Sequence, residues 1–287
     1  MFTGSDVVAL RQKTGAGILD CKKALTETNG DMDKAVDYLR EKGIATAAKK
    51  AGRIAAEGAC YAEVKGNTAV LVEVNCESDF VSKGDMFGAF AKSVADYIFA
   101  NDVKDVEEVI EAMKEQTTEA IQKIGENIKI RRFVKYVSDQ TLSSYIHMGG
   151  KIGVVVECAN GVSADTIHDV ALQIAAAKPL YVKDEDVPAE IIEKEKEILI
   201  AQIKNDPKLA NKPDQVIERM VEGKVKKYYE ENCVLNQAFV KDPSLTVGAL
   251  LKKENSTVVR FTRFEMGEGL EKKSNDFAAE VEAQMKK

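Results

Sequence analysis

Apolar residues recur every three to four positions through the start of the chain, which is the spacing of amphipathic helices. The pattern predicts three short helices, at residues 5–13, 18–28 and 32–42. Ser5 and Asp31 stand where helix N-caps are expected, and Asn29-Gly30 stands where a helix ends. An Ala- and Lys-rich run at residues 44–53 is expected to lead out as a helical linker. Three helices bury a very small core, and we expect such a unit to bind another protein.

Two strand patterns further along the chain resemble each other. The stretch GNTAVLVEV, from Gly66, aligns with GKIGVVVEC, from Gly150, at an offset of 84 residues. Each follows a predicted partner strand through a glycine-containing turn, which indicates an antiparallel hairpin. The partner strands are expected at residues 57–65 and 142–147, and helices are expected afterwards at 78–100 and 164–177. The pattern therefore predicts two related core subdomains.

A later pair of matching strands is farther apart. IRRF, from Ile130, and VVRF, from Val258, lie 128 residues apart, so the second copy should contain an insert of 44 residues. Two highly charged helical patterns, at 188–204 and 215–228, flank the stretch NDPKLANKP. Its prolines cannot continue a helix, which predicts an antiparallel helical hairpin. The thin apolar seam and the abundant charge are typical of a solvated coiled coil.

The last stretch, SNDFAAEVEAQMKK, predicts a short amphipathic helix bearing Phe277, Val281 and Met285. The predicted fold class is therefore α+β, with a helical module, duplicated α/β core subdomains with antiparallel strands, an inserted coiled-coil hairpin and a C-terminal helix. The predicted domains are residues 1–52 for the module and linker, 53–140 for the first core subdomain, and 141–287 for the second, with the hairpin at 186–228 and a C-terminal helical module at 270–287.

Composition and charge narrow the classes of function. The chain has 287 residues, 45% of them hydrophobic and 31% charged, as expected for a globular protein of about two domains. A net charge of -6 argues against a protein whose main task is to coat nucleic acid. We expect a cytoplasmic protein, because the sequence has neither a long apolar run nor a leader with a basic start and an apolar core. Its five cysteines form no CxxC pair, so neither a zinc site nor a disulfide framework is indicated.

Catalytic patterns are missing from the sequence. No glycine-rich phosphate loop has the required spacing, and no Ser/His/Asp or Cys/His arrangement is indicated. The two histidines, His147 and His168, are interpreted as an ordinary turn residue and an ordinary helical residue. We therefore expect no enzyme, no catalytic residues, no cofactor and no metal ligands.

Within the junction EVNCESDFVSKGDMF, residues 73–87, one side chain, Phe80, has two possible interpretations. Ser78 suits an N-cap, and Asp79 suits the positive end of a helix dipole. Phe80 stands seven residues before Phe87, on the apolar stripe of the predicted helix, and this spacing favours a buried core residue. The first turn of a helix is also its most exposed part, so a ring displayed to a partner stays open as the alternative.

Five stretches, in order, resemble the bacterial translation elongation factor Ts family: LRQKTGAGILDCKKAL, VNCESDFVSK, IGENIKIRR, MVEGKVKKYY and RFEMGEGLEK. The resemblance implies a guanine-nucleotide exchange factor for elongation factor Tu. It implies that the first helices form a ubiquitin-associated-like module, which docks on the partner's nucleotide-binding domain through Arg11, Ile18, Leu19 and Lys22. The last helix is implied to touch the same domain.

The resemblance also assigns the junction a role. Residues Ser78, Asp79, Phe80 and Val81 match the family's Thr-Asp-Phe-Val element, which intrudes near the partner's Mg²⁺ site. Together with Ser82 they form the predicted partner-binding element. Here Ser replaces Thr and keeps the hydroxyl. We therefore expect Phe80 to be an exposed wedge that displaces the metal, so that GDP leaves. Val240 matches a contact to the partner's third domain, and His147 matches a residue that packs against the partner.

Other functions remain open at this point. The leading alternative is a ubiquitin-associated-like adaptor that binds a protein without exchange activity. An accessory protein that binds RNA or the ribosome would need a basic surface, which the acidic balance disfavours. We expect no nucleic-acid and no membrane partner, and the sequence leaves open whether the chain forms a homodimer.

Overall fold

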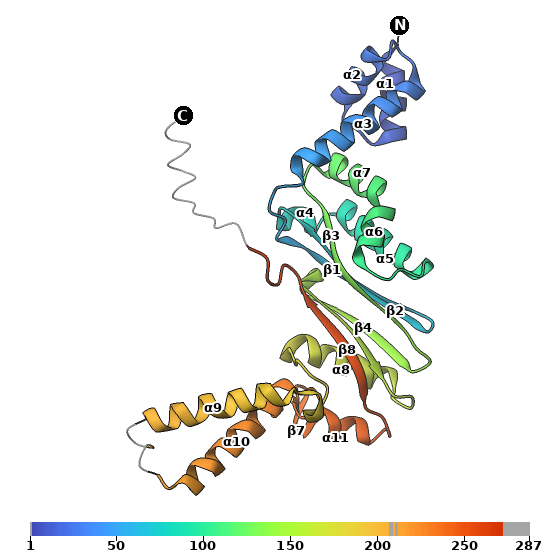
Figure 1. Cartoon of the computed structure of the whole chain (residues 1–287). Coiled ribbons are helices and arrows are strands. Elements are labelled where there is room, and N and C mark those ends of the chain that lie inside the picture. The colour runs from blue at the N-terminus through green and yellow to red at the C-terminus, as the bar shows by residue number, and fades with distance from the viewer. Residues whose placement is uncertain (1, 207–208, 210–211, 272–287) are drawn as a thin grey trace.

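The structure is a computed structural model that describes residues 2–206, 209 and 212–271. It mixes helices with antiparallel sheets, so the fold class is α+β as predicted. Figure 1 shows an elongated arrangement, with the N-terminal helices at one end, the sheets in the middle and a helical hairpin reaching out from the other end. Within the described residues, no helix is both long enough and apolar enough to cross a membrane.

The chain opens with three helices, α1 (Gly4–Thr14), α2 (Ile18–Glu27) and α3 (Met32–Lys50). They enclose a small core formed by Val7, Leu10, Ala16, Cys21, Ala24, Leu25, Ala35 and Leu39. Thr3 caps α1, so the prediction of Ser5 as the cap was wrong. The Thr3 hydroxyl accepts from the N–H of Asp6, and the Asp6 carboxylate accepts from the N–H of Thr3 at 2.7 Å. This reciprocal capping box satisfies two N–H groups and starts the helix earlier.

The run at residues 44–53 was predicted to be helical, and it is helical as far as Lys50, but as an unbroken continuation of α3 rather than a separate linker. Its second half packs on α7 (Lys114–Ile124). Gly43 lies close against Gln122 there, and Ala47 packs on the core beneath the first sheet. The Ala-rich run is therefore a packing surface, which explains why it stays helical.

Two three-stranded antiparallel sheets fill the middle of the described structure. The first has the order β1-β2-β3, with strands Glu57–Lys65, Thr68–Cys76 and Lys129–Val137. The second has the order β4-β5-β8, with strands Thr141–His147, Ile152–Cys158 and Val258–Glu265. β1 with β2, and β4 with β5, form the predicted hairpins, and β4 starts at Thr141 rather than Leu142.

The two sheets face each other, and helices cover their outer sides (Figure 1). The helices on the first sheet are α5 (Asp85–Ala100), α6 (Val106–Ala112) and α7, and those on the second are α8 (Ala164–Ala177) and α11 (Val247–Lys252). Val70 and Val72 of β2 pack toward helices, whereas Leu71 packs toward the second sheet. Gly153 of β5 permits this approach, because a Cβ there would lie 2.5 Å from Leu71 Cδ1.

A buried glutamate occupies the same place in each central strand. Glu73 of β2 pairs across the sheet with Arg132 of β3, and the carboxylate accepts a hydrogen bond at 2.5 Å. Glu157 of β5 pairs with Arg260 of β8 in the same way, also at 2.5 Å. Each guanidinium also lies over a ring of the opposite sheet, Phe264 for Arg132 and Tyr136 for Arg260. These reciprocal contacts hold the sheets together.

A helical hairpin formed by α9 (Ala189–Asn205) and α10 (Asp214–Asn232) stands away from the sheets (Figure 1). The two helices share a separate buried seam, formed by Ile192, Ile203, Ile217, Val221 and Val225. α10 continues past its predicted end at residue 228. At the base of the hairpin, the N–H groups of Leu180 and Tyr181 both donate to the carbonyl of Asn232. The two ends of the insert therefore lie side by side.

The sequence pattern missed α6, α7, α11 and a small pair of strands, β6 (Ala238–Phe239) and β7 (Asp242–Thr246). Two short 3-10 turns, η1 (Met148–Gly150) and η2 (Asp184–Asp186), were also not predicted. Apart from α7, these segments have seven residues or fewer and offer few periodic positions. The predicted C-terminal helix, with Phe277, Val281 and Met285, lies outside the described residues.

Candidate partner-binding site

The α4 element, residues 78–82, lies directly after the central strand of the first sheet. Helix α4 (Asp79–Ser82) is a single turn, capped by the Ser78 hydroxyl, which accepts from the N–H of Val81 at 3.3 Å. Val81 is half-buried and packs on the core beneath the sheet. Phe80 points the other way, with 84% of its surface exposed. Val81 thus anchors the element, and the preceding side chain, Phe80, is displayed.

A break in the helix accounts for the exposure of Phe80. The pattern predicted one helix over residues 78–100, but the structure has α4 and then a second helix, α5, that starts at Asp85 after Gly84. The break changes the direction of the chain, so the seven-residue spacing no longer puts Phe80 and Phe87 on one face. Phe87 is 1% exposed and belongs to the core. The core interpretation of Phe80 was therefore wrong, and the expectation of an exposed ring is confirmed.

Asp79 keeps its charge at the exposed end of this turn. Lys83 donates to the Asp79 carboxylate at 2.8 Å. This hydrogen bond, and more weakly the positive charge of Lys151, hold the pKa of Asp79 below its ordinary value. The element therefore presents an apolar ring beside an ionised carboxylate at neutral pH.

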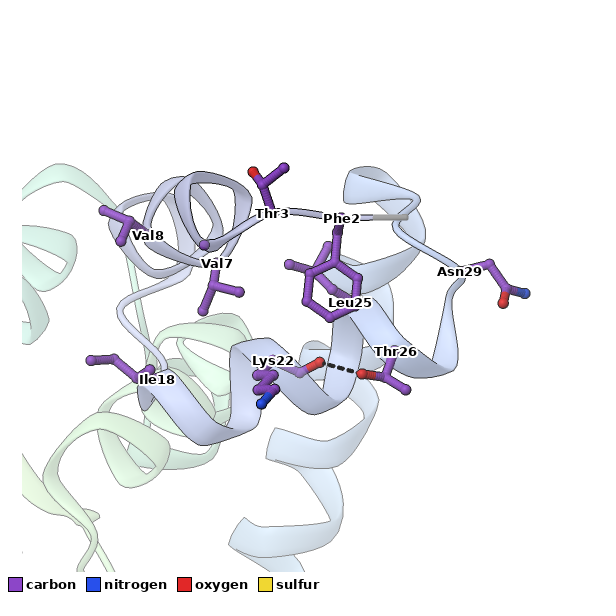
Figure 2. A pocket seen from close by; sticks show the side chains of 10 residues that line it. Phe2, Thr3, Val7, Val8, Ile18, Lys22, Leu25, Thr26 and Asn29 are labelled. Atoms are coloured by element: carbon purple, nitrogen blue, oxygen red, sulfur yellow. Dashed lines mark hydrogen bonds between the residues drawn. The ribbon is translucent and has the colours of Figure 1, made fainter.

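The N-terminal helices present a second exposed surface. Arg11, Ile18, Leu19 and Lys22 are all exposed there, and Leu19 is 81% exposed. Ile18 and Lys22 line an open groove of about 770 Å³ between the start of the chain, α1 and α2. Figure 2 shows the apolar groups that line this groove with Ile18, among them Phe2, Val7, Val8 and Leu25. An apolar groove with a cation at its border is suited to hold part of another protein.

The remaining predicted residues lie elsewhere on the molecule. His147 ends β4, half-buried, with its Nδ1 3.1 Å from the Tyr145 hydroxyl. Val240 is exposed in the turn between β6 and β7, and its N–H donates to the side chain of Gln173 at 2.8 Å. Residues 78–82 thus form one continuous element, and Arg11, Ile18, Leu19 and Lys22 are all exposed on the first two helices, while His147 and Val240 belong to other elements.

No metal centre is built among the described residues, since no three His, Cys, Asp or Glu side chains gather there in a suitable arrangement. All five cysteines are free and buried. Burial raises the pKa of Cys60, Cys76, Cys158 and Cys233 to about 12, so these thiols stay protonated at neutral pH.

Comparison with known proteins decides the family. Residues 77–268 match the family model described as elongation factor TS. A protein named elongation factor Ts from Halothermothrix orenii is 48% identical over 296 aligned residues, which cover 98% of each chain. Another of the same name, from Clostridium novyi, is 47% identical over 307 aligned residues, which cover 99% of each chain.

The chain belongs to the elongation factor Ts family. Membership in the elongation factor Ts family assigns the chain a nucleotide-exchange role in translation elongation. The family model begins at Glu77, immediately before the α4 element, and ends at Glu268, after the last strand of the second sheet. The N-terminal helices lie outside it, but the two relatives align over nearly the whole chain and so include them.

Proposed function

We propose that this chain binds elongation factor Tu carrying GDP and that its α4 element displaces the partner's Mg²⁺, so that GDP is released. The observation that carries the proposal is Phe80, a large apolar ring with 84% of its surface exposed on a capped helical turn. An exposed ring stabilises the free protein little, since it gains little burial. Its position is explained if it is buried only when the partner is bound.

The physical basis of release is electrostatic. A bound GDP is held by contacts to its phosphates and by Mg²⁺ that bridges phosphate and protein oxygens. A ring inserted beside the metal separates the groups that hold it, and the neighbouring Asp79 carboxylate competes for the polar contacts. Loss of the metal removes the largest positive charge opposite the diphosphate. Binding of the exchange factor and binding of GDP must then weaken each other by the same factor.

In this proposal, contacts made by the rest of the chain provide affinity for elongation factor Tu. The N-terminal helices, a ubiquitin-associated-like module, dock on the partner's nucleotide-binding domain through Arg11, Ile18, Leu19 and Lys22. Val240 and His147 make further contacts, and the C-terminal module touches the same nucleotide-binding domain. The proposal also includes the division of the chain into domains after residues 52 and 140. In it, the α9–α10 hairpin is a coiled-coil arm. The role requires no bond to be made or broken, and hence no catalytic residue.

A second candidate function is an adaptor that binds a protein through the N-terminal groove of about 770 Å³ without any exchange activity. One experiment separates the two. Release of labelled GDP from elongation factor Tu is measured with and without this protein, alongside binding of the two proteins. We expect release to accelerate with the concentration of the chain and to saturate. Binding without faster release would support the adaptor instead.

A further inference from the structure

A loop distant in sequence holds the start of α4. It follows α7 and contains Glu126, whose carboxylate accepts three hydrogen bonds. Oε2 accepts from the N–H of Glu77 and from the N–H of Ser78, each at 3.0 Å. Oε1 accepts from the Ser78 hydroxyl at 2.6 Å. Hydrogen bonds to an ionised acceptor are stronger than those between neutral groups.

The Ser78 hydroxyl links the Glu126 carboxylate to helix α4. It donates to Glu126 and accepts from the N–H of Val81 at 3.3 Å, and a hydroxyl can do both at once. The carboxylate, the hydroxyl and the first turn therefore form one connected chain of hydrogen bonds. Because the ring of Phe80 is exposed, its direction depends on the backbone that this chain holds.

The next residue of the same loop holds the end of the N-terminal segment. Asn127 is buried, and its side chain donates to the carbonyl of Arg53 at 2.8 Å. Its N–H donates to the Glu77 carboxylate at 2.8 Å, which also lies 3.5 Å from the Arg53 guanidinium. Lys50, at the end of α3, donates to the carbonyl of Gly125. Residues 125–127 thus join the exit from α3 to the entry into α4.

We propose that Glu126 is a positioning residue of the α4 element, which fixes the first turn of α4 in the direction in which Phe80 meets the partner. This inference rests on the proposed function. An element held in its bound direction loses less conformational freedom on binding, so more of the binding energy remains for displacing the metal. Without the carboxylate, Val81 still anchors α4 in the core, but the start of the turn is held less firmly, because four helical residues cannot stabilise themselves.

The second half of the molecule offers a matched control. Glu254 accepts from the N–H of Ser163 at 2.6 Å, from the Ser163 hydroxyl at 3.1 Å and from the Thr166 hydroxyl at 2.6 Å. It therefore caps α8 by the chemistry with which Glu126 caps α4. The first turn of α8 presents no aromatic ring, and its Ile167 is buried. Glu254→Gln removes the same kind of interaction without moving a wedge.

The test is a set of release assays with elongation factor Tu and labelled GDP. The proteins are the wild type, Glu126→Gln, Phe80→Ala, the double variant and Glu254→Gln. In Gln one carboxylate oxygen becomes an NH₂ donor, which cannot accept from the donors that converge here. We expect Glu126→Gln to lower the maximal release rate about tenfold, with the half-saturating concentration nearly unchanged. In the Phe80→Ala background it should have no further effect, because both changes act through the ring.

Three results would overturn the inference. One is a double variant in which the two effects multiply, and another is an equal loss of rate in Glu254→Gln. The third comes from hydrogen exchange of the isolated protein. We expect the amides of Glu77 and Ser78 to exchange faster in Glu126→Gln while that of Ser163 does not change, and unaltered protection contradicts the inference. If the wild type fails to accelerate release, the proposed function itself falls, but the amide measurement still decides whether Glu126 fixes α4.

Discussion

The two halves of the molecule pass from strand to helix in different ways. In the second half, the central strand β5 leads into the 14-residue helix α8, whose N-terminus is capped by Ser163. In the first half, the central strand β2 leads into the single turn α4, and a break at Gly84 precedes the long helix α5. Both halves have a buried glutamate–arginine pair and a glutamate that caps the helix. The shared parts therefore build the scaffold, whereas the added turn displays Phe80.

The strongest test of this comparison uses two phenylalanines seven positions apart. Phe87→Ala should lower the free energy of unfolding by about 3–5 kcal/mol, because it empties a filled site beneath the first sheet. Phe80→Ala should change it by no more than about 0.5 kcal/mol, because its ring is exposed. Urea unfolding followed by circular dichroism measures both values. Similar losses for the two variants would return Phe80 to the core.

Replacing the buried glutamates should cause the next largest loss of unfolding free energy. Glu73 is fully buried and accepts from Arg131, from Arg132 and from the N–H of Gly267. Burial opposes its charge, but these hydrogen bonds outweigh burial and hold the pKa of Glu73 below its ordinary value of 4.5. We expect Glu73→Gln to cost about 2–3 kcal/mol of unfolding free energy at pH 7. Glu157→Gln should cost less, because Glu157 has one arginine partner where Glu73 has two.

The lowered pKa of Glu73 predicts that the stability contributed by its carboxylate depends on pH. A carboxyl with a lowered pKa in the folded state stabilises the protein above the unfolded pKa, and this contribution is lost as pH falls through the folded pKa. The difference in unfolding free energy between wild type and Glu73→Gln should therefore be full at pH 7 and shrink below about pH 4.5. Urea unfolding at several pH values measures it. A difference that does not change with pH would show that the charge of Glu73 is not what stabilises the fold.

Replacing the hairpin should change the stability of the two sheets little. Its buried seam is separate from the cores of the two sheets, and Leu180 and Tyr181 meet Asn232 at its base. A short Gly/Ser linker in place of residues 186–228 should leave cooperative unfolding of the sheets within about 1 kcal/mol of wild type. Loss of that transition would show that the hairpin is an integral layer of the fold.

The periodic parts of this fold could be predicted from the sequence. The first three helices, both hairpins of strands and the helical insert follow from spacing, glycines and prolines alone. The offset between matching strands predicts the size of the insert independently of its helical pattern, and the ends of the insert meet in the structure.

The parts that could not be predicted depend on contacts between distant residues. The seven-residue spacing of Phe80 and Phe87 assumed one continuous helix, and Gly84 was the available signal for a break. Glu126 bonds Ser78 from 48 positions away, and no spacing rule relates them. The packing of one sheet on the other was also missed, although the apolar residues of β2 run through both of its faces, which is typical of a strand buried on both sides.

The most direct test of the central claim is release of labelled GDP from elongation factor Tu by the wild type and by Phe80→Ala, at low and at high Mg²⁺. We expect the wild type to accelerate release and high Mg²⁺ to oppose it, because the metal and the ring compete for one local arrangement. Phe80→Ala should still bind and keep its melting temperature, but release should slow by about tenfold or more at saturation. Release at the wild-type rate by a folded Phe80→Ala protein would contradict the claim.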